Sequence, residues 1–347
     1  MHMPGHKGKA MLGFEPYDLT EIDGADDLMA PDGIIAQSEA EASRLFGART
    51  FYSCGGSTLC IQVMLHLISL YAAQCGKKPV VLAGRNAVKA FVYACALLDI
   101  GIEWIYPVDE QSYIACNITA LQISERLAGQ HGRITAVYIT SPDYLGNMQD
   151  IAAIARACHE SGALLSVDNA HGAYLKFMPT PAHPMDLGAD ICCDSAHKTL
   201  GVITGGAYLH ISVSAPAVLA ERAKASFSVF GTSSPSYLIL QSLDAANGTT
   251  EAFRNELRAF LSAADALKAK LAAHGFELAG GEALKLTLKP KSFGYSGQDI
   301  AATLEAANIY PEFYDPDYIV LMLSPQHSER ELDALCDTLC SLPRRAS

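Results

Sequence analysis

The feature that most constrains this fold is an alternation of short apolar runs with longer amphipathic stretches between residues 55 and 210. Strands that alternate with helices of about 10 to 15 residues indicate a mostly parallel sheet with helices on both faces. The expected strands are 79–83, 102–106, 134–140, 164–167, 191–193 and 206–211, and the expected helices are 59–75, 87–98, 117–130 (capped by Asn117) and 150–160.

The C-terminal part of the sequence has a different pattern. Helical periodicity dominates residues 235–274, and expected strands at 284–288 and 318–323 flank an expected helix at 298–308, before a last helix near Ser328. We therefore predict an α/β protein with two domains. The large domain spans residues 1–240, with an N-terminal segment 1–50, and residues 241–347 form a smaller α/β domain.

Composition excludes several classes of partner. The chain of 347 residues is half hydrophobic and carries a net charge of -12 without basic runs, so nucleic acid and anionic membranes are not expected partners. Ten cysteines without a C-x-x-C pair, most of them in apolar stretches, indicate reduced thiols. We find no signal-peptide core and expect no uncharged apolar run of the roughly 18 residues that span a membrane. A cytoplasmic protein is predicted.

Lys198 is the first candidate for chemistry. It lies in the run Asp-Ser-Ala-His-Lys-Thr at residues 194–199, directly after a short apolar strand. A lysine among small and apolar residues is desolvated, which lowers its pKa and makes it nucleophilic toward an aldehyde. The alternative is an ordinary surface lysine.

Two hydroxyl-rich loops precede helices and are candidates for phosphate binding. Residues 53–58 read Ser-Cys-Gly-Gly-Ser-Thr, and residues 231–237 read Gly-Thr-Ser-Ser-Pro-Ser-Tyr. Glycine lets the backbone approach a phosphate, and the first N–H groups of a helix point at it. Plain helix starts are the alternative for both loops.

Asp168 ends the apolar run 164–167, where open α/β sheets place their ligands. A carboxylate there can keep a pyridine nitrogen protonated, although a turn-forming aspartate is the alternative. A phosphate loop, then Asp168, then Lys198 is the order expected of pyridoxal 5'-phosphate (PLP) enzymes with the aspartate-aminotransferase fold (fold type I). No metal site is expected.

The sequence resembles the Orn/Lys/Arg decarboxylase family, in a short form. The matching stretches run nearly end to end: residues 3–8, 26–28, 46–48, 55–58, 140–144, 168–172 and 195–200. The resemblance implies a PLP-dependent transferase-like large domain with a seven-stranded sheet, and decarboxylation of arginine, lysine or ornithine through a Schiff base at Lys198.

The resemblance also implies a role for each matching residue. Lys198, His197 and Asp168 would be catalytic, Ala170 would pack against the cofactor ring, and Thr232 and Ser234 would reach the phosphate of a neighbouring subunit in a homodimer. The implied cofactor-binding residues are Gly56, Ser57, Thr58, Val88, Asp168, Ala170, Ser195, His197, Lys198, Thr232 and Ser234. Glu312, His171 and Tyr144 are candidates for contact with the amino-acid substrate. His197, His171 and Tyr144 are also candidate proton carriers near the ring, and a packed, purely structural role is the alternative for each.

Val88 departs from the family pattern, which carries a ring-stacking histidine at this place. Valine loses that aromatic contact, worth roughly 0.5–1.5 kcal/mol. The chain also begins at the Pro-Gly-His-Lys sequence and ends without the family's additional C-terminal domain. Two alternatives therefore stay open. The chain catalyses another PLP reaction, as a lyase or an aminotransferase, or it is a weakly active PLP-binding paralogue. A non-PLP α/β protein is a further alternative.

Overall fold

The computed structural model describes residues 2–107, 112–130 and 132–345, which form two compact units. Unit 1 comprises Met1–Ser141, Gln149–Lys176 and Thr180–Thr250, and unit 2 comprises Pro142–Met148, Phe177–Pro179 and Glu251–Ser347. The domain boundary expected after residue 240 falls inside helix α8 (Tyr237–Gly248).

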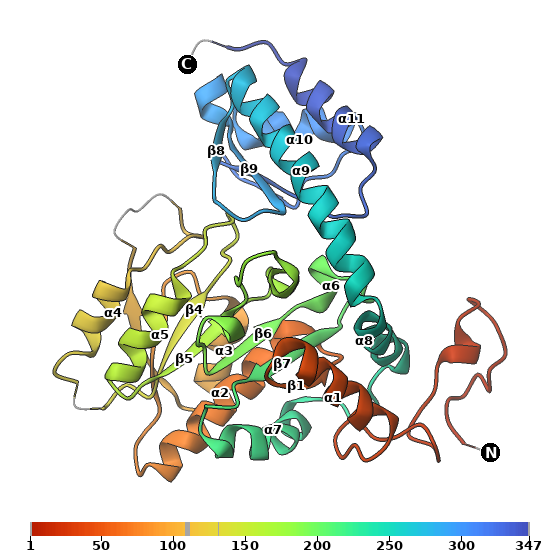
Figure 1. The fold of residues 1–347 in the computed structure, drawn as a ribbon, viewed down its shortest axis with the longest axis vertical. Helices are drawn as coiled ribbons and strands as arrows, with labels where there is room; N and C mark the ends of the chain where they lie inside the picture. The colour runs from red at the N-terminus through yellow and green to blue at the C-terminus, as the bar shows by residue number, and fades with distance from the viewer. Residues whose placement is uncertain (1, 108–111, 131, 346–347) are drawn as a thin grey trace. The chain divides into compact units, whose positions relative to one another are not determined.

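The first unit contains the larger sheet (Figure 1). Its strands are β1 (Arg49–Ser53), β2 (Val80–Gly84), β3 (Gly101–Ile105), β4 (Ala136–Thr140), β5 (Leu164–Asp168), β6 (Ile191–Asp194) and β7 (Ala207–Ile211). Its helices are α1 (Ile34–Phe46), α2 (Gly56–Gln74), α3 (Lys89–Leu97), α4 (Ala120–Leu127), α5 (Ile151–Glu160), α6 (Ala196–Thr199), α7 (Ala217–Phe230) and α8, with short 3-10 turns at Glu15–Tyr17, Ala173–Phe177 and Pro184–Asp186.

The sheet has seven strands in the order β1-β7-β6-β5-β4-β2-β3. β7 pairs antiparallel with both β1 and β6, and the other pairs are parallel. All strands except β7 therefore run in one direction, and their carboxyl ends lie at one edge. The predicted α/β class and the seven-stranded, mostly parallel sheet are confirmed.

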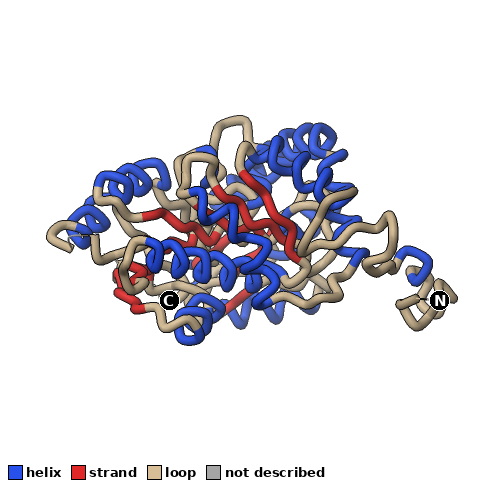
Figure 2. Tube along the Cα trace, turned by 90° about the horizontal axis from the view of Figure 1, so that it is seen from below, coloured by secondary structure: helices blue, strands red, loops and turns tan. Residues whose placement is uncertain are grey.

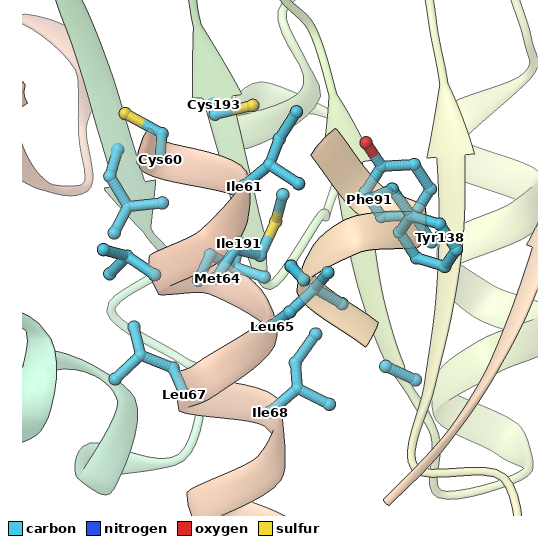
Figure 3. Packing of buried hydrophobic residues seen from close by; sticks show 14 of the residues in the cluster. Cys60, Ile61, Met64, Leu65, Leu67, Ile68, Phe91, Tyr138, Ile191 and Cys193 are labelled. Atoms are coloured by element: carbon cyan, nitrogen blue, oxygen red, sulfur yellow. The ribbon is translucent and has the colours of Figure 1, made fainter. Parts of the chain in front are cut away.

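Helices lie on both faces of the sheet (Figure 2). Side chains of successive strand residues accordingly enter two different cores. On one face, Tyr138 and Cys193 pack with apolar residues of α2, α3 and α7 (Figure 3). On the other, Val137 and Cys192 pack with residues of α4 and α5. This period of two orients alternate residues of β4, β5 and β6 toward the same helix layer.

Helix α2 corrects one expectation from the sequence. Its 19 residues carry no charge, so by length and composition it passes the test for a membrane span. Eight of its residues, from Cys60 to Ala72, are buried, and most of these pack in the core beside α3 and α7. The described fold therefore uses α2 as a core helix.

A second correction concerns the start of α4. Thr119, and not Asn117, is its N-cap, because the Thr119 hydroxyl accepts a hydrogen bond from Gln122 N–H and the Gln122 side chain returns one to Thr119 N–H. The helix ends at Leu127, before the expected end at residue 130. Four helices and strands of the first unit were not expected from the sequence: α1, β1, the single turn α6, and α7.

The second unit contains a four-stranded antiparallel sheet in the order β10-β11-β9-β8. Its elements are α9 (Thr250–His274), β8 (Glu277–Ala279), β9 (Lys285–Lys289), a 3-10 turn at Pro290–Phe293, α10 (Gly297–Ala306), β10 (Phe313–Tyr314), β11 (Ile319–Met322) and α11 (Glu329–Cys340). Ser328 caps α11 through a capping box with Glu331, where the sequence indicated a helix start.

Candidate functional site

The candidate residues of the first unit converge at one edge of the larger sheet. Ser57 follows β1, Val88 follows β2, Asp168 ends β5 and Lys198 follows β6. These four strands run in the same direction, so their carboxyl ends meet at this edge. Open α/β sheets bind their ligands at that edge.

Lys198 lies in the single helical turn α6 and is half-buried. Its Nζ lies 3.0 Å from Nε2 of His171, which is buried in the segment after Asp168. A neutral imidazole nitrogen at this distance can accept a proton from an ammonium group or return one to an amine. The structure thus pairs the candidate nucleophile with a candidate proton carrier.

The loop before α2 offers the donors that a phosphate requires. Gly56 has φ +66°, a left-handed conformation that favours glycine, and a Cβ there would meet open space. Ser195 Oγ donates to Ser57 Oγ at 2.9 Å, and Thr58 is exposed at the start of the helix. These hydroxyl groups and the first N–H groups of α2 form one cluster of donors.

Asp168 is buried and held by neutral donors. Its Oδ1 accepts from Ala170 N–H at 3.2 Å and lies 3.7 Å from the Cys193 thiol, and its Oδ2 accepts from Tyr138 O–H at 3.1 Å. Burial raises the pKa of Asp168 above its ordinary value, although these donors and the charge of Lys198 act in the opposite direction. The carboxylate therefore gains from any cationic partner at the sheet edge.

Asp194, four residues before Lys198, belongs to a second buried network. Its Oδ2 accepts from Nε2 of His183 at 2.9 Å and of His210 at 3.1 Å, and its Oδ1 accepts from Asn169 Nδ2 at 2.7 Å. Burial alone raises the pKa of Asp194, but the two histidines lower it well below its ordinary value. The network ties the strand end before Lys198 to the segment after Asp168.

The Asp194 network has residue types that bind metals, and one ligand atom from each of Asp194, His183 and His210 lies within 4.8 Å of the others. However, Nδ1 of His183 accepts a hydrogen bond from Met185 N–H at 3.3 Å. Its Nε2 therefore carries the proton of a neutral imidazole and donates to Asp194. This proton assignment fits a hydrogen-bonded anion better than a metal ligand.

Three other expected residues have defined surroundings. His197 Nδ1 lies 2.9 Å from Gly206 O, which places its proton on Nδ1. Ala170 is buried directly after Asp168 and Asn169. Val88 is the N-cap residue of α3 and is 44% exposed. Its apolar side chain is therefore not part of the hydrophobic core.

The loop that carries Thr232 and Ser234 lies between α7 and α8, and both residues are exposed. Thr232 lines a cavity of about 240 Å³ together with Gly55 and Thr58 of the same chain. The second hydroxyl-rich loop therefore adjoins the first within one chain. Its expected action on a neighbouring subunit stays a prediction.

Tyr144 and Glu312 both belong to the second unit. Tyr144 O–H donates to Glu312 Oε1 at 2.7 Å, and its ring makes an edge contact with Phe313 at 5.5 Å between centroids. Burial raises the pKa of Tyr144, and the Glu312 charge raises it further. The two candidate substrate residues thus form a pair of their own.

Sequence reasoning missed Tyr138 and Thr140 of β4 and the role of Asp194. Thr140 is the strand partner of Asp168, and among the described residues its Oγ1 is a buried hydroxyl without a hydrogen-bond partner. Hydroxyl groups at alternate positions of an otherwise apolar strand were the available signal, because alternate residues share a face of the sheet.

Comparisons with known proteins agree with this geometry. Residues 8–286 match the family described as Orn/Lys/Arg decarboxylase, major domain. The chain is 31% identical to the uncharacterized protein YaaO of Bacillus subtilis over 355 residues, covering 96% of this chain and 72% of that protein. It is 30% identical to the arginine decarboxylase of the same organism over 379 residues, covering 100% and 74%.

Solved structures show the same fold. Lysine decarboxylase A from Pseudomonas aeruginosa superimposes with a TM-score of 0.82 at 18% identity, over 98% of this chain. This chain spans 57% of the length of that protein. Serine palmitoyltransferase from Sphingomonas wittichii follows with a TM-score of 0.69 at 14% identity, over 88% of this chain.

Proposed function

We propose that this chain, which belongs to the Orn/Lys/Arg decarboxylase family, removes carbon dioxide from arginine, lysine or ornithine with PLP attached to Lys198 as a Schiff base. The family consists of PLP-dependent amino-acid decarboxylases. We assign these roles to residues because Lys198, Asp168 and the hydroxyl pair Ser57–Ser195 lie at the same edge of the sheet.

The residues at this edge fit PLP group by group. The donors at the start of α2 suit a phosphate, Asp168 suits a protonated ring nitrogen, and Lys198 suits an aldehyde. The buried Thr140 hydroxyl, without a partner in the described structure, lies beside Asp168 where a polar group of a ligand would satisfy it. When bound, PLP supplies an electron sink for the pair of electrons left by the departing carboxylate.

The chain's own residues would then do four things. Ser57, Thr58 and Ser195 bind the phosphate and set the position of the ring. Asp168 stabilises the positive charge of the ring nitrogen. His171 Nε2, at 3.0 Å from Lys198 Nζ, accepts the proton that Lys198 must lose before it reacts, and returns it later. Val88 covers the ring with an apolar surface.

The substrate follows from the family and from charge. Glu312 is exposed in the second unit and its carboxylate is held by Tyr144, so we infer that this pair binds the distal cationic group of a basic amino acid. We further infer a cytoplasmic enzyme that acts as a homodimer, in which Thr232 and Ser234 contact the phosphate of the partner. The free state of all ten cysteines is consistent with a reducing compartment.

Product analysis tests this function. The PLP-loaded protein is incubated separately with arginine, lysine and ornithine, and the products are identified by mass spectrometry. We expect the corresponding amine, with release of carbon dioxide, from one of the three. Lys198→Ala should abolish this product, whereas Lys78→Ala, which replaces an exposed lysine, should leave it unchanged.

One observation favours a second candidate function. The exposed Val88 stands where the family carries a ring-stacking aromatic residue, so the orientation of the substrate carboxylate is less constrained. A keto acid instead of an amine would indicate an aminotransferase. PLP bound at Lys198 without any product from the three amino acids would indicate a binding paralogue and contradict the decarboxylase proposal.

A further inference from the structure

We propose that Tyr138 is a positioning residue that, together with the Cys193 thiol on the opposite side, fixes the orientation and the proton affinity of the Asp168 carboxylate. The inference rests on the proposed function, because it assigns Asp168 to the ring nitrogen of PLP. It adds a residue that the sequence motifs do not contain.

The geometry places one donor on each side of the carboxylate. Strand β5, which carries Asp168, lies between β4 and β6 in the sheet. Tyr138 O–H reaches Oδ2 from β4 at 3.1 Å, and the Cys193 thiol approaches Oδ1 from β6 at 3.7 Å. Ala170 N–H adds a third donor to Oδ1 at 3.2 Å. Both oxygens are therefore held, and rotation of the carboxylate costs at least one hydrogen bond.

Packing prevents the Tyr138 hydroxyl from moving away. The ring of Tyr138 is fully buried and packs against Phe91 of α3, with 4.3 Å between ring centroids (Figure 3). A phenylalanine would fill this position in the apolar core equally well. A buried hydroxyl group without an acceptor lowers the stability of the protein, so the hydroxyl group of Tyr138 needs a partner. The contact with Asp168 explains why this place carries tyrosine and not phenylalanine.

The groups around Asp168 make the Tyr138 donor important. The charge of Lys198 on α6 lowers the pKa of Asp168. The charge of Asp168 in turn raises the pKa of three thiols: Cys60 of α2, and Cys192 and Cys193 of β6. Burial raises the pKa of all three thiols, so they are neutral near pH 7. Burial also raises the pKa of Tyr138, which keeps its proton and remains a donor.

A donor to Asp168 reduces the affinity of the carboxylate for a further proton. Without Tyr138 O–H, Asp168 competes more strongly for the proton of the ring nitrogen and is freer to rotate. Both effects weaken the charge that the site presents to the cofactor. Tyr138 thus acts on the reaction through Asp168.

The test compares Tyr138→Phe with Tyr52→Phe. Tyr52 is a matched control, because it is also buried and its hydroxyl bonds Ser38 and Asn247 away from Asp168. Two quantities are measured in each protein: the pKa of Asp168 without cofactor, by NMR of ¹³C-labelled aspartate, and the dissociation constant for PLP, by fluorescence titration.

We expect Tyr138→Phe to raise the pKa of Asp168 by about one unit and to weaken PLP binding about tenfold, as for the loss of one hydrogen bond to a charged group. Tyr52→Phe should change neither. Equal values in the two variants would overturn the inference. If Tyr138→Phe does not fold, Cys193→Ala removes the opposite donor, and an unchanged Asp168 pKa there would also overturn it.

The two proposals can fail separately. A wild-type protein that does not bind PLP at Lys198 would refute the proposed function, whereas the NMR measurement on the cofactor-free protein still decides whether Tyr138 controls Asp168.

Discussion

Asp168 and Asp194 are both buried, and each ends one of two neighbouring strands, β5 and β6. Their surroundings nevertheless move their pKa values in opposite directions. Asp194 accepts hydrogen bonds from His183, His210 and Asn169, and its pKa is lowered. Burial raises the pKa of Asp168, and its neutral donors and the charge of Lys198 do not offset this effect.

The comparison supports our interpretation of Asp194 as a structural carboxylate and of Asp168 as the carboxylate of the proposed site. The carboxylate of Asp194 accepts hydrogen bonds from three side chains of the protein. Its charge therefore stabilises the fold and holds the segment before Lys198. The buried negative charge of Asp168 is less well stabilised by the protein, and a cationic ring nitrogen would stabilise it. Perturbed carboxylates of the second kind mark functional sites, because the fold bears a cost that only a ligand offsets.

The largest expected effect comes from Asp168→Asn. We expect the decarboxylation rate constant to fall by about 10²–10³-fold, the usual loss when one preorganised charge is removed from a site. The unfolding free energy of the cofactor-free protein should stay the same or rise, because a buried carboxylate with a raised pKa is no longer present. Stopped assays and urea unfolding measure the two quantities. A large loss of stability would place Asp168 in the same class as Asp194.

Asp194→Asn should show the reverse pattern. An amide cannot accept from both imidazole N–H groups and from Asn169 as the carboxylate does, so buried donors lose their partner. We expect the unfolding free energy to fall by about 2–4 kcal/mol. Urea unfolding of the cofactor-free protein checks this. A stability equal to that of wild type would show that the network is dispensable.

The smallest expected effect is a change in pH dependence. Burial lowers the pKa of His210 below its ordinary 6.5, despite the nearby Asp194 charge. The folded state therefore binds fewer protons than the unfolded state as the pH falls below about 6.5, and stability is lost on acidification. His210→Gln should reduce this slope by up to about 1.4 kcal/mol per pH unit between pH 6.5 and 5.

The control for this prediction is His159→Gln, which replaces a half-exposed histidine. Asp194 itself should contribute to the slope only below about pH 4, because a lowered carboxylate pKa keeps its stabilisation until the pH falls that far. An unchanged slope in His210→Gln would contradict the assignment of a neutral, buried His210.

The sequence predicted the parallel strands well, because their apolar runs are bounded by turns and alternate with amphipathic helices. It did not predict β1, whose Arg49 and Thr50 are polar and whose place is set by pairing with β7, more than 150 residues later. Helix α1 was not predicted either, and no side chain caps its N-terminus.

The candidate site shows the same limit. Lys198 and Asp168 could be proposed from local patterns, since each directly follows or ends an apolar strand. The histidine partners of Asp194 could not, because His183 and His210 meet Asp194 only through turns and strand pairing. The hydroxyl group of Tyr138 was visible on an apolar strand, but its contact with Asp168 depends on the pairing of β4 with β5. Contacts across strands depend on register, which short runs of sequence do not reveal.

The most direct test of the account is to find the lysine that attaches the cofactor. The protein is loaded with PLP, reduced with borohydride and digested, and the modified peptide is identified by mass spectrometry, with Lys198→Ala and Lys78→Ala treated in parallel. The account predicts a single label on Lys198, absent from Lys198→Ala and retained in Lys78→Ala. A label on another lysine, or none on the wild-type protein, would contradict it.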